Sequence, residues 1–283
     1  MQKEPGQPIL CPVDFSDVSA YALRYAAEVA RCRDLPVIAL HASWWEVPPY
    51  FTEARVAELQ KEFRDSQRAA GHSLRAFVDS ALEGAGKKVT TRLVEALPAD
   101  GILRAATDTA AGLIVMGTHG RSGWNRWTLG SVAERVLRES EIPVLTVRRD
   151  LQHPIRQILC PVSDTPESGR ALDMAAHFGA CFGAVVTALH VHEPQATAPI
   201  ASLCAWIAPE QRTHCQIREL VHHGNAAEEI LRVLSQENYD LLVVGAPRRR
   251  FFDGMTLGGT TLRAVRHAPC PVLTVGAALP RLS

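Results

Sequence analysis

The sequence lacks several features that would assign the protein to a particular class. It has no run of about 18 apolar residues to span a membrane, and its opening segment Met1–Leu10 has no apolar core of a secretory signal. Lysine plus arginine equals aspartate plus glutamate at 30 each. The overall charge therefore gives no reason to expect binding to nucleic acid or to an anionic membrane. We expect a cytoplasmic protein without either partner.

The cysteines also lack an informative pattern. The seven cysteines form no Cys-x-x-Cys pair and their total is odd, which argues against a disulfide framework. We expect them to serve mainly as small residues of the hydrophobic core.

The sequence does contain an internal repeat that covers most of the chain. The segment ILCPV occurs at Ile9–Val13 and again at Ile158–Val162, an offset of 149 residues. The segment PVLTV occurs at Pro143–Val147 and again at Pro271–Val275, an offset of 128, so the second copy is about 21 residues shorter. A chain of 283 residues is long enough for two hydrophobic cores. The repeat predicts two domains, residues 1–150 and 151–283.

Apolar runs predict strands that alternate with helices in both copies. In the first copy, we expect strands at Ile9–Val13, Val37–Ala42, Val89–Val94, Leu113–Met116 and Val144–Val147. In the second copy, we expect strands near Ile158, Val185, Ile217, Leu241 and Val272. The segment missing from the second copy is a long amphipathic helix. This alternation predicts an α/β fold, with two doubly wound parallel sheets that carry helices on both faces.

The stretch Met116–Val132 has the composition of a phosphate-binding loop. Gly117 and Gly120 follow an apolar strand, and Gly130 with Ser131 begins a predicted helix. Glycines let backbone N–H groups approach an anion, and a helix N-terminus offers unpaired donors and a positive dipole end. The stretch lacks the Gly-Lys-Ser/Thr of a P-loop and the G-x-G-x-x-G spacing of a dinucleotide site. We predict a nucleotide site, with tight packing of the turn as the alternative reason for the glycines.

The motifs resemble those of the universal stress protein family. The resemblance rests on Gly117-x2-Gly120-x9-Gly130-Ser131, on Pro12-Val13-Asp14 after the first strand, and on the closing segment Pro143–Val147. It covers nearly the whole chain, and the tandem arrangement is similar to that of two-domain members. The resemblance implies five-stranded sheets of the adenine nucleotide alpha hydrolase type, with the strand order 3-2-1-4-5.

The resemblance also implies which residues bind ATP. Val13 and Asp14 would lie at the adenine and ribose end, with Ala42 and Val94 closing around the base. The residues along the ribose and phosphates would be Met116, Gly117, His119, Gly120, Gly130, Ser131 and Val132. Arg121 and Arg126 add cations that can turn toward the phosphates, and Ser131 can donate to phosphate or help to hold Mg²⁺. Ligands of open parallel sheets bind beyond the carboxyl ends of the strands, where these residues fall.

The second copy retains only part of this pattern. Gly245 and Gly258 persist, but Arg248 stands in place of the second glycine, Gly259 replaces the serine, and Ser163 replaces Asp14. An arginine side chain cannot substitute for glycine where the backbone must contact phosphate. We expect weak or absent ATP binding in this copy, although the loop Arg248–Phe252 is basic enough to meet an anion.

Histidine and cysteine gather in the second copy. His190 and His192 lie two residues apart on a predicted strand and so share a face, and His222 and His223 follow the next strand. The same part of the chain also contains Cys204, His214 and Cys215. Imidazole and thiolate suit zinc, but the spacing matches no standard zinc motif, and His41 is the repeat counterpart of His190. A zinc site is therefore an alternative to core or solvated roles for these histidines.

We predict an ATP-binding stress-response protein whose second domain acts as a pseudo-dimer partner. The resemblance implies that the edge strands Val144–Val147 and Val272–Val275 pair across a pseudo-two-fold axis, and a further homodimer stays open. The alternatives are a slow ATPase, with His119 assisting a water molecule, and a nucleotide-independent scaffold or zinc-binding module. We expect the Trp- and Pro-rich loop Trp44–Tyr50 mainly to pack, with a lid over the base, an inter-domain contact or a site for an outside partner as the alternatives.

Overall fold

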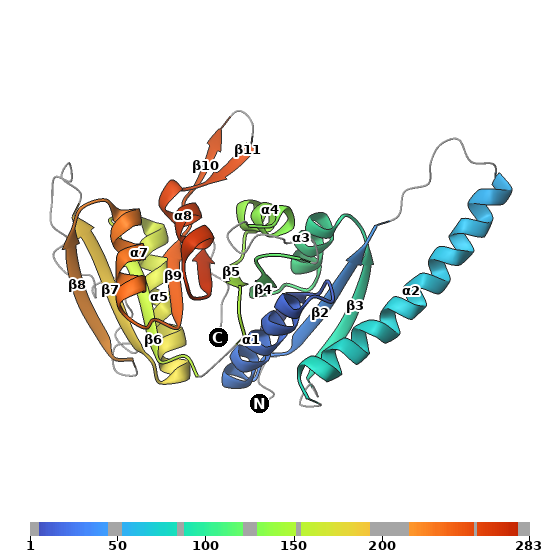
Figure 1. Cartoon of the computed structure of the whole chain (residues 1–283), viewed down its shortest axis with the longest axis horizontal. Helices are drawn as coiled ribbons and strands as arrows, with labels where there is room; N and C mark the ends of the chain where they lie inside the picture. The colour runs from blue at the N-terminus through green and yellow to red at the C-terminus, as the bar shows by residue number, and fades with distance from the viewer. Residues whose placement is uncertain are drawn as a thin grey trace.

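Each half of the chain forms a parallel sheet, and the two sheets join edge to edge (Figure 1). The computed structural model describes residues 6–44, 53–83, 88–120, 129–150, 154–192, 215–251 and 254–276, with the side chains of residues 53–64 and 248–257 left aside. Most of the loop Trp44–Tyr50 lies outside these residues. Within the described part of the chain, no helix has an apolar stretch long enough to cross a membrane.

The first half alternates strands and helices as its apolar periodicity predicts. Its elements are β1 (Ile9–Pro12), α1 (Asp17–Arg33), β2 (Val37–Ser43), α2 (Glu53–Ala81), β3 (Val89–Glu95), α3 (Pro98–Asp108), β4 (Leu113–Gly117), α4 (Ser131–Glu139) and β5 (Val144–Val147). All neighbouring strands pair in parallel in the order β3-β2-β1-β4-β5. The expected strand order is confirmed.

The second half repeats this arrangement without a described counterpart of α2. Its elements are β6 (Gln157–Val162), α5 (Pro166–Phe182), β7 (Val185–His192), β8 (Ile217–His223), α7 (Ala226–Gln236), β9 (Leu241–Gly245), β10 (Arg248–Phe251), β11 (Gly254–Leu257), α8 (Gly259–His267) and β12 (Val272–Val275). The parallel order β8-β7-β6-β9 continues to β12 and matches the first half.

One segment of the second half differs from expectation. The sequence predicts a loop at Arg248–Phe252, but Arg248–Phe251 pairs with Gly254–Leu257 as an antiparallel two-stranded ribbon. The physical reason is that the four residues of β10 include no glycine, so extended backbone is sterically favoured where the first half has Gly120. In Figure 1 the ribbon projects from the edge of the body beside α4 and α8.

The helices cover both faces of the joined sheet. Apolar side chains of α1, α2 and α5 form one core with one face of the strands, and those of α3, α4, α7 and α8 form a second core on the other face. Each core contains residues of both halves, so burial of apolar surface continues across the junction. Figure 1 shows that α2 runs beyond the sheet at its N-terminal end, whereas Leu74 and Val78 near its C-terminal end are buried.

The two sheets join through equivalent edge strands. β5 and β12 pair antiparallel, with Leu145 opposite Leu273, and form one ten-stranded sheet. The Thr146 hydroxyl donates to the carbonyl of Val272 at 3.1 Å, and the Thr274 hydroxyl donates to the carbonyl of Val144 at 3.2 Å. These reciprocal contacts are those of a two-fold interface. The expectation that these edges pair is confirmed.

The expectation that the cysteines form no disulfide is wrong for one pair. Cys32, in the last turn of α1, and Cys181, in the last turn of α5, form a disulfide with Cα atoms 5.9 Å apart. Their separation of 149 residues equals the repeat offset, so the pseudo-two-fold axis brings one position of the repeat next to its own copy. Neither the Cys-x-x-Cys spacing nor the number of cysteines indicates such a contact between two distant positions. Other described cysteines are buried, as expected: Cys11, Cys160, Cys215 and Cys270.

Arg148 connects the end of the first half to a helix of the second. Its guanidinium donates to the carbonyls of Val265 and Arg266 in the last turn of α8. Carbonyls at a helix C-terminus lack helical partners and attract positive charge. Burial lowers the pKa of this guanidinium, so the hydrogen bonds must offset a desolvation penalty.

We expect Arg148→Ala to lower the free energy of unfolding by about 1–3 kcal/mol, because two carbonyls at the domain junction lose their donor. The neighbouring exposed Arg149 supplies the matched control, and Arg149→Ala should change stability by less than about 0.5 kcal/mol. Chemical denaturation of both variants measures the difference. Equal stability of the two variants would contradict the role given to Arg148.

Candidate functional site

A cavity of about 360 Å³ opens at the carboxyl ends of β1, β2 and β4, beside the N-terminus of α4. This is the switch in strand order, where β1 lies between β2 and β4 and ligands of doubly wound sheets bind. The volume lies within the usual range of small-molecule sites, roughly 300–1,000 Å³.

Most of the site residues expected from the sequence line this cavity. They are Val13, Asp14, Ala42, Met116, Gly117, His119, Gly120, Gly130, Ser131 and Val132. Val94 is not among the lining residues: it pairs with Ala42 in register, and its side chain packs toward Gly101 of α3. Arg121 and Arg126 lie outside the described residues.

The sequence interpretation missed several lining residues. His41, Thr118 and Ser19 contribute polar groups, while Leu40, Pro98 and Ile102 contribute apolar wall. The repeat carried a signal for His41, because its counterpart is His190. No sequence pattern pointed to the residues of α3, because only the packing of that helix on the sheet brings them to the cavity.

Ser16 both begins α1 and holds the carboxylate of Asp14. Its hydroxyl donates to Asp14 Oδ1 at 2.6 Å, and its backbone N–H donates to the same oxygen at 3.1 Å. The Ser16 Oγ atom also accepts from the backbone N–H of Ser19 at 3.2 Å, which makes Ser16 the N-cap of α1. The expected N-cap thus also positions a residue of the cavity.

The backbone turn between these residues is conformationally costly. Phe15 has φ 65°, in the left-handed region that bulky residues rarely occupy, at a cost of about 1–2 kcal/mol. Its ring contacts the rings of His41 and Phe77, with centroid distances of 4.7 and 5.6 Å. This aromatic packing holds the turn that directs Asp14 back onto Ser16.

The glycines allow the two loops of the cavity to approach each other. A Cβ atom on Gly120 would lie 2.6 Å from Asp14 Oδ2, and one on Gly117 would lie 2.8 Å from Val18 Cγ1. Gly130 donates from its backbone to Thr118 O at 2.8 Å, which joins the two ends of the glycine loop. Tight packing, the alternative explanation for the glycines, is therefore present at these positions and shapes the cavity.

His119 is oriented by its neighbour at the wall of the cavity. Thr118 is buried, its backbone N–H donates to Val147 O at 2.9 Å, and its hydroxyl lies 2.7 Å from His119 Nδ1. The bond to Val147 ties the glycine loop to β5, the strand that joins the two halves.

The N-terminus of α4 faces the cavity without a side-chain cap. Its N-cap residue is Gly130, which has no side-chain hydrogen bond to the first turn, and Gly130, Ser131, Val132 and Ala133 all line the cavity. The first amide groups of a helix and the positive end of its dipole attract anions. This end of the cavity therefore suits a phosphate group.

The equivalent region of the second half is built differently. Ser163, in place of Asp14, has its hydroxyl 3.0 Å from that of Ser168 at the start of α5. A Cβ atom on Gly245 would lie 2.8 Å from the backbone of Glu167, so strand β9 and helix α5 are in close contact there. At this position the second half therefore has a hydroxyl where Asp14 provides a carboxylate.

The histidines of β7 and β8 contact other protein groups. His190 Nδ1 lies 3.0 Å from Val162 O, as His41 Nδ1 lies 2.8 Å from Val13 O, so this contact belongs to the repeated scaffold. The ring of His192 packs between those of His190 and His223, with centroid distances of 4.5 and 5.4 Å.

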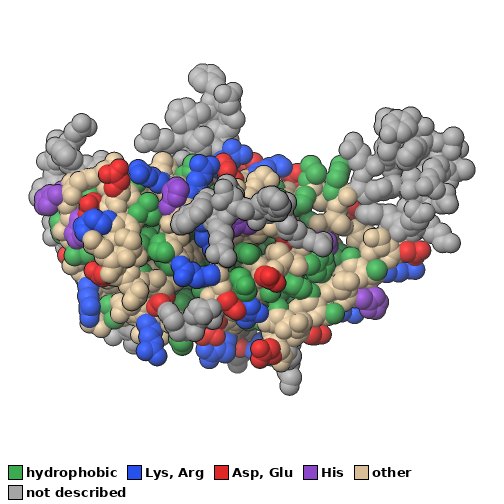
Figure 2. Space-filling model, viewed as in Figure 1, with side chains coloured by type: hydrophobic (Ala, Val, Ile, Leu, Met, Phe, Trp, Pro, Cys, Tyr) green, Lys and Arg blue, Asp and Glu red, His purple; other side chains and the backbone are tan. Residues whose placement is uncertain are grey.

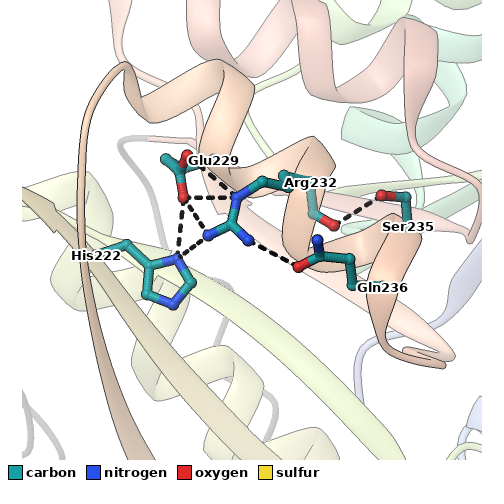
Figure 3. Close-up of polar contacts among 5 residues, drawn as sticks. All are labelled: His222, Glu229, Arg232, Ser235 and Gln236. Atoms are coloured by element: carbon teal, nitrogen blue, oxygen red, sulfur yellow. Dashed lines mark hydrogen bonds and ion pairs between the residues drawn. The ribbon is translucent and has the colours of Figure 1, made fainter.

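His222, on β8, forms a charged network with Glu229 and Arg232 of α7 (Figure 3). Its Nδ1 lies 3.0 Å from Glu229 Oε2 and 2.8 Å from Arg232 Nη2. Hydrogen bonds from Arg232 and His222 lower the pKa of Glu229. Among the described residues, no group of three His, Cys, Asp or Glu is arranged to hold a metal ion, and Cys204 and His214 lie outside them. The described residues of this region therefore do not provide a set of ligands for the zinc site considered as an alternative.

Comparisons with known proteins agree with the fold. The sequence profile of the universal stress protein family matches residues 6–148 and 154–276. A universal stress protein of Mycolicibacterium smegmatis is 28% identical over 292 residues, covering 94% of this chain and 96% of that protein. Universal stress protein MJ0531 of Methanocaldococcus jannaschii is 35% identical over 145 residues, covering 50% of this chain and 81% of its own length. A universal stress protein structure from Archaeoglobus fulgidus has a TM-score of 0.68 at 18% identity, covering 96% of this chain and 98% of that one.

The close approach at Gly117 is open to a direct test. We expect Gly117→Ala to lower the free energy of unfolding by about 1–3 kcal/mol, because the new Cβ overlaps Val18. Adding Val18→Ala should recover part of that loss, which a double-mutant cycle measures as a coupling energy.

Gly259→Ala is the control for this test, because no described atom outside its chain neighbours and its own helix backbone lies within 4 Å of its Cβ position. It should leave stability unchanged or slightly raised. If Gly117→Ala is as stable as the wild type, the close approach of Gly117 to Val18 does not restrict this position to glycine.

Proposed function

Because the chain belongs to the universal stress protein family, we propose that it binds one ATP molecule in the cavity of its first domain, residues 1–150. The second domain, residues 151–283, completes the joined sheet as a pseudo-dimer partner. The observation that carries the proposal is the cavity itself, where the Asp14 carboxylate, three glycines and the uncapped N-terminus of α4 converge.

The cavity has an apolar end and an anion-binding end, as a nucleotide requires. Val13, Ala42 and Ile102 supply apolar wall against which a purine base can pack. At the other end, backbone N–H groups of the glycine loop and the first turn of α4 suit phosphates. These two ends support the proposed direction of the nucleotide.

Asp14 and Ser131 fit the remaining groups of a nucleotide. A carboxylate held by Ser16 accepts hydrogen bonds from ribose hydroxyls, as acidic residues do in other nucleotide sites of doubly wound sheets. The Ser131 hydroxyl, at the first position of α4, is a hard oxygen donor suited to Mg²⁺ or to phosphate. We propose that Mg²⁺ accompanies the nucleotide and neutralises part of its phosphate charge.

The first prediction concerns the number of sites. Calorimetric titration with ATP and Mg²⁺ should give one site per chain. Gly130→Val should weaken binding at least about 10-fold, or roughly 1.4 kcal/mol, because its side chain would crowd Thr118 O at the phosphate end.

Gly258→Val is the matched control, because Gly258 is the equivalent N-cap of α8 in the second domain. It should leave ATP affinity unchanged. Two sites per chain, or equal affinity in wild type and Gly130→Val, would contradict the proposal.

The second prediction separates helix capping from ligand binding. Thr165 caps α5 as Ser16 caps α1, since its side chain accepts from Ser168 N, but no carboxylate depends on it. Ser16→Ala and Thr165→Ala should each cost about 1 kcal/mol in unfolding free energy. Only Ser16→Ala should weaken ATP binding, by about 3- to 10-fold, because Asp14 loses its short hydrogen bond. If both variants bind ATP like the wild type, Ser16 does not position Asp14 for the ligand.

A further inference from the structure

We propose that Cys32 and Cys181 are a reversible redox modification site that covalently locks the two domains to each other. They lie at the same position of the two copies, on helices α1 and α5 that pack in one core across the domain junction. Their Cα separation of 5.9 Å is within the range of ordinary disulfides, about 4.4–6.8 Å. The folded backbone therefore holds the two sulfur atoms in position to bond.

These two cysteines are the accessible ones in the described part of the chain. Cys32 and Cys181 are partly exposed, whereas Cys11, Cys160, Cys215 and Cys270 are buried. Burial raises the pKa of the buried thiols, to about 12 for Cys270, so they stay protonated and unreactive. Among the described cysteines, a soluble oxidant would therefore react selectively at the pair between the helices.

Cys181 borders a small, mostly apolar cavity of about 10 Å³, room for about one water molecule, which the side chains of Arg33 and His177 also line. The packed helices therefore leave free space next to one cysteine of the pair. Either thiol can act as the attacking group, because the two cysteines occupy equivalent positions of the repeat.

The oxidant that fits is a low-molecular-weight disulfide. The thiolate of one cysteine attacks one sulfur of that disulfide; the S–S bond of the small disulfide breaks, one small thiolate leaves, and the other half stays on the protein as a mixed disulfide. The thiolate of the second cysteine then attacks the protein sulfur of the mixed disulfide, and the second small thiolate leaves. Two protein thiols are oxidised, one small disulfide is reduced to two thiols, and the two protons pass to the released thiolates. Excess small thiol reverses both steps.

The site lies away from the proposed nucleotide cavity, so the two are independent. Helix α1 begins beside the cavity, which Ser19 of its first turn lines, and it ends at Arg33. Cys32 is in the last turn of α1, at the end of the helix that points away from the cavity. Without the disulfide, the described contacts between the domains include the β5–β12 pairing, the two shared apolar cores and the hydrogen bonds of Arg148 to α8, none of which is covalent. The bond adds a constraint across 149 residues of chain, which chiefly restricts the unfolded state.

The test uses the full chain equilibrated with oxidised glutathione or with dithiothreitol. After thiols are blocked with N-ethylmaleimide, peptide mapping should find the Cys32 and Cys181 peptides linked only in the oxidised sample. The oxidised protein should melt at least about 5 °C higher than the reduced protein. Dithiothreitol should restore the lower melting temperature.

Three variants make the test specific. Cys32→Ser and Cys181→Ser should each abolish the redox-dependent change in melting temperature, and Cys204→Ser should retain it. Absence of the linked peptides in oxidised glutathione would overturn the proposal, and this outcome does not depend on whether the variants fold. A melting shift that persists in both Cys32→Ser and Cys181→Ser would overturn it as well.

Discussion

The antiparallel contact between β5 and β12 removes the two strand edges that separate five-stranded sheets would expose. Unpaired edges recruit other strands, so this pairing protects both halves at once. The pairing also relates the two halves by a pseudo-two-fold axis, with Leu145 opposite Leu273. The other contacts at the junction follow from this arrangement. Helices α1 and α5 share a core, and Arg148 reaches the last turn of α8, because the edge strands lie in this register.

The two copies keep their common residues where they build the joined sheet and differ where loops leave it. The segments ILCPV and PVLTV are the same in both copies and form buried strands at the centre of each sheet and at the junction. By contrast, Asp14 becomes Ser163 and the glycine loop becomes the ribbon β10–β11. Burial and backbone pairing constrain the residues of the strands, and both halves need them. The residues of the loops are constrained by what the cavity binds, and such a constraint can act on one half alone.

Those features of the fold that depend on local sequence were predictable. Apolar runs predicted the strands, and Ser16 was recognisable as an N-cap because its hydroxyl acts on the residues next to it. The glycine loop and Asp14 were placed at one edge because the carboxyl ends of parallel strands meet there. Thr118, Pro98 and Ile102 escaped prediction because their part in the cavity depends on how α3 and β5 pack. Val94, expected beside the base, is not among the lining residues, because its side chain packs toward Gly101 of α3.

The Cys32–Cys181 contact shows what sequence comparison within a repeat can and cannot reveal. Cys11 and Cys160 share the same offset of 149 residues but are free and buried. They lie on β1 and β6, which are five strand spacings apart in the joined sheet, or roughly 24 Å at about 4.8 Å per spacing. Helices α1 and α5 pack over β4 and β9, which are only three spacings apart, roughly 14 Å. Each helix also extends over the junction, α1 onto β5 and α5 onto β12, so the facing sides of α1 and α5 come into contact. Two residues at equivalent positions of the repeat therefore contact each other only where both lie near the pseudo-two-fold axis. The order of the strands in the joined sheet determines which positions lie there.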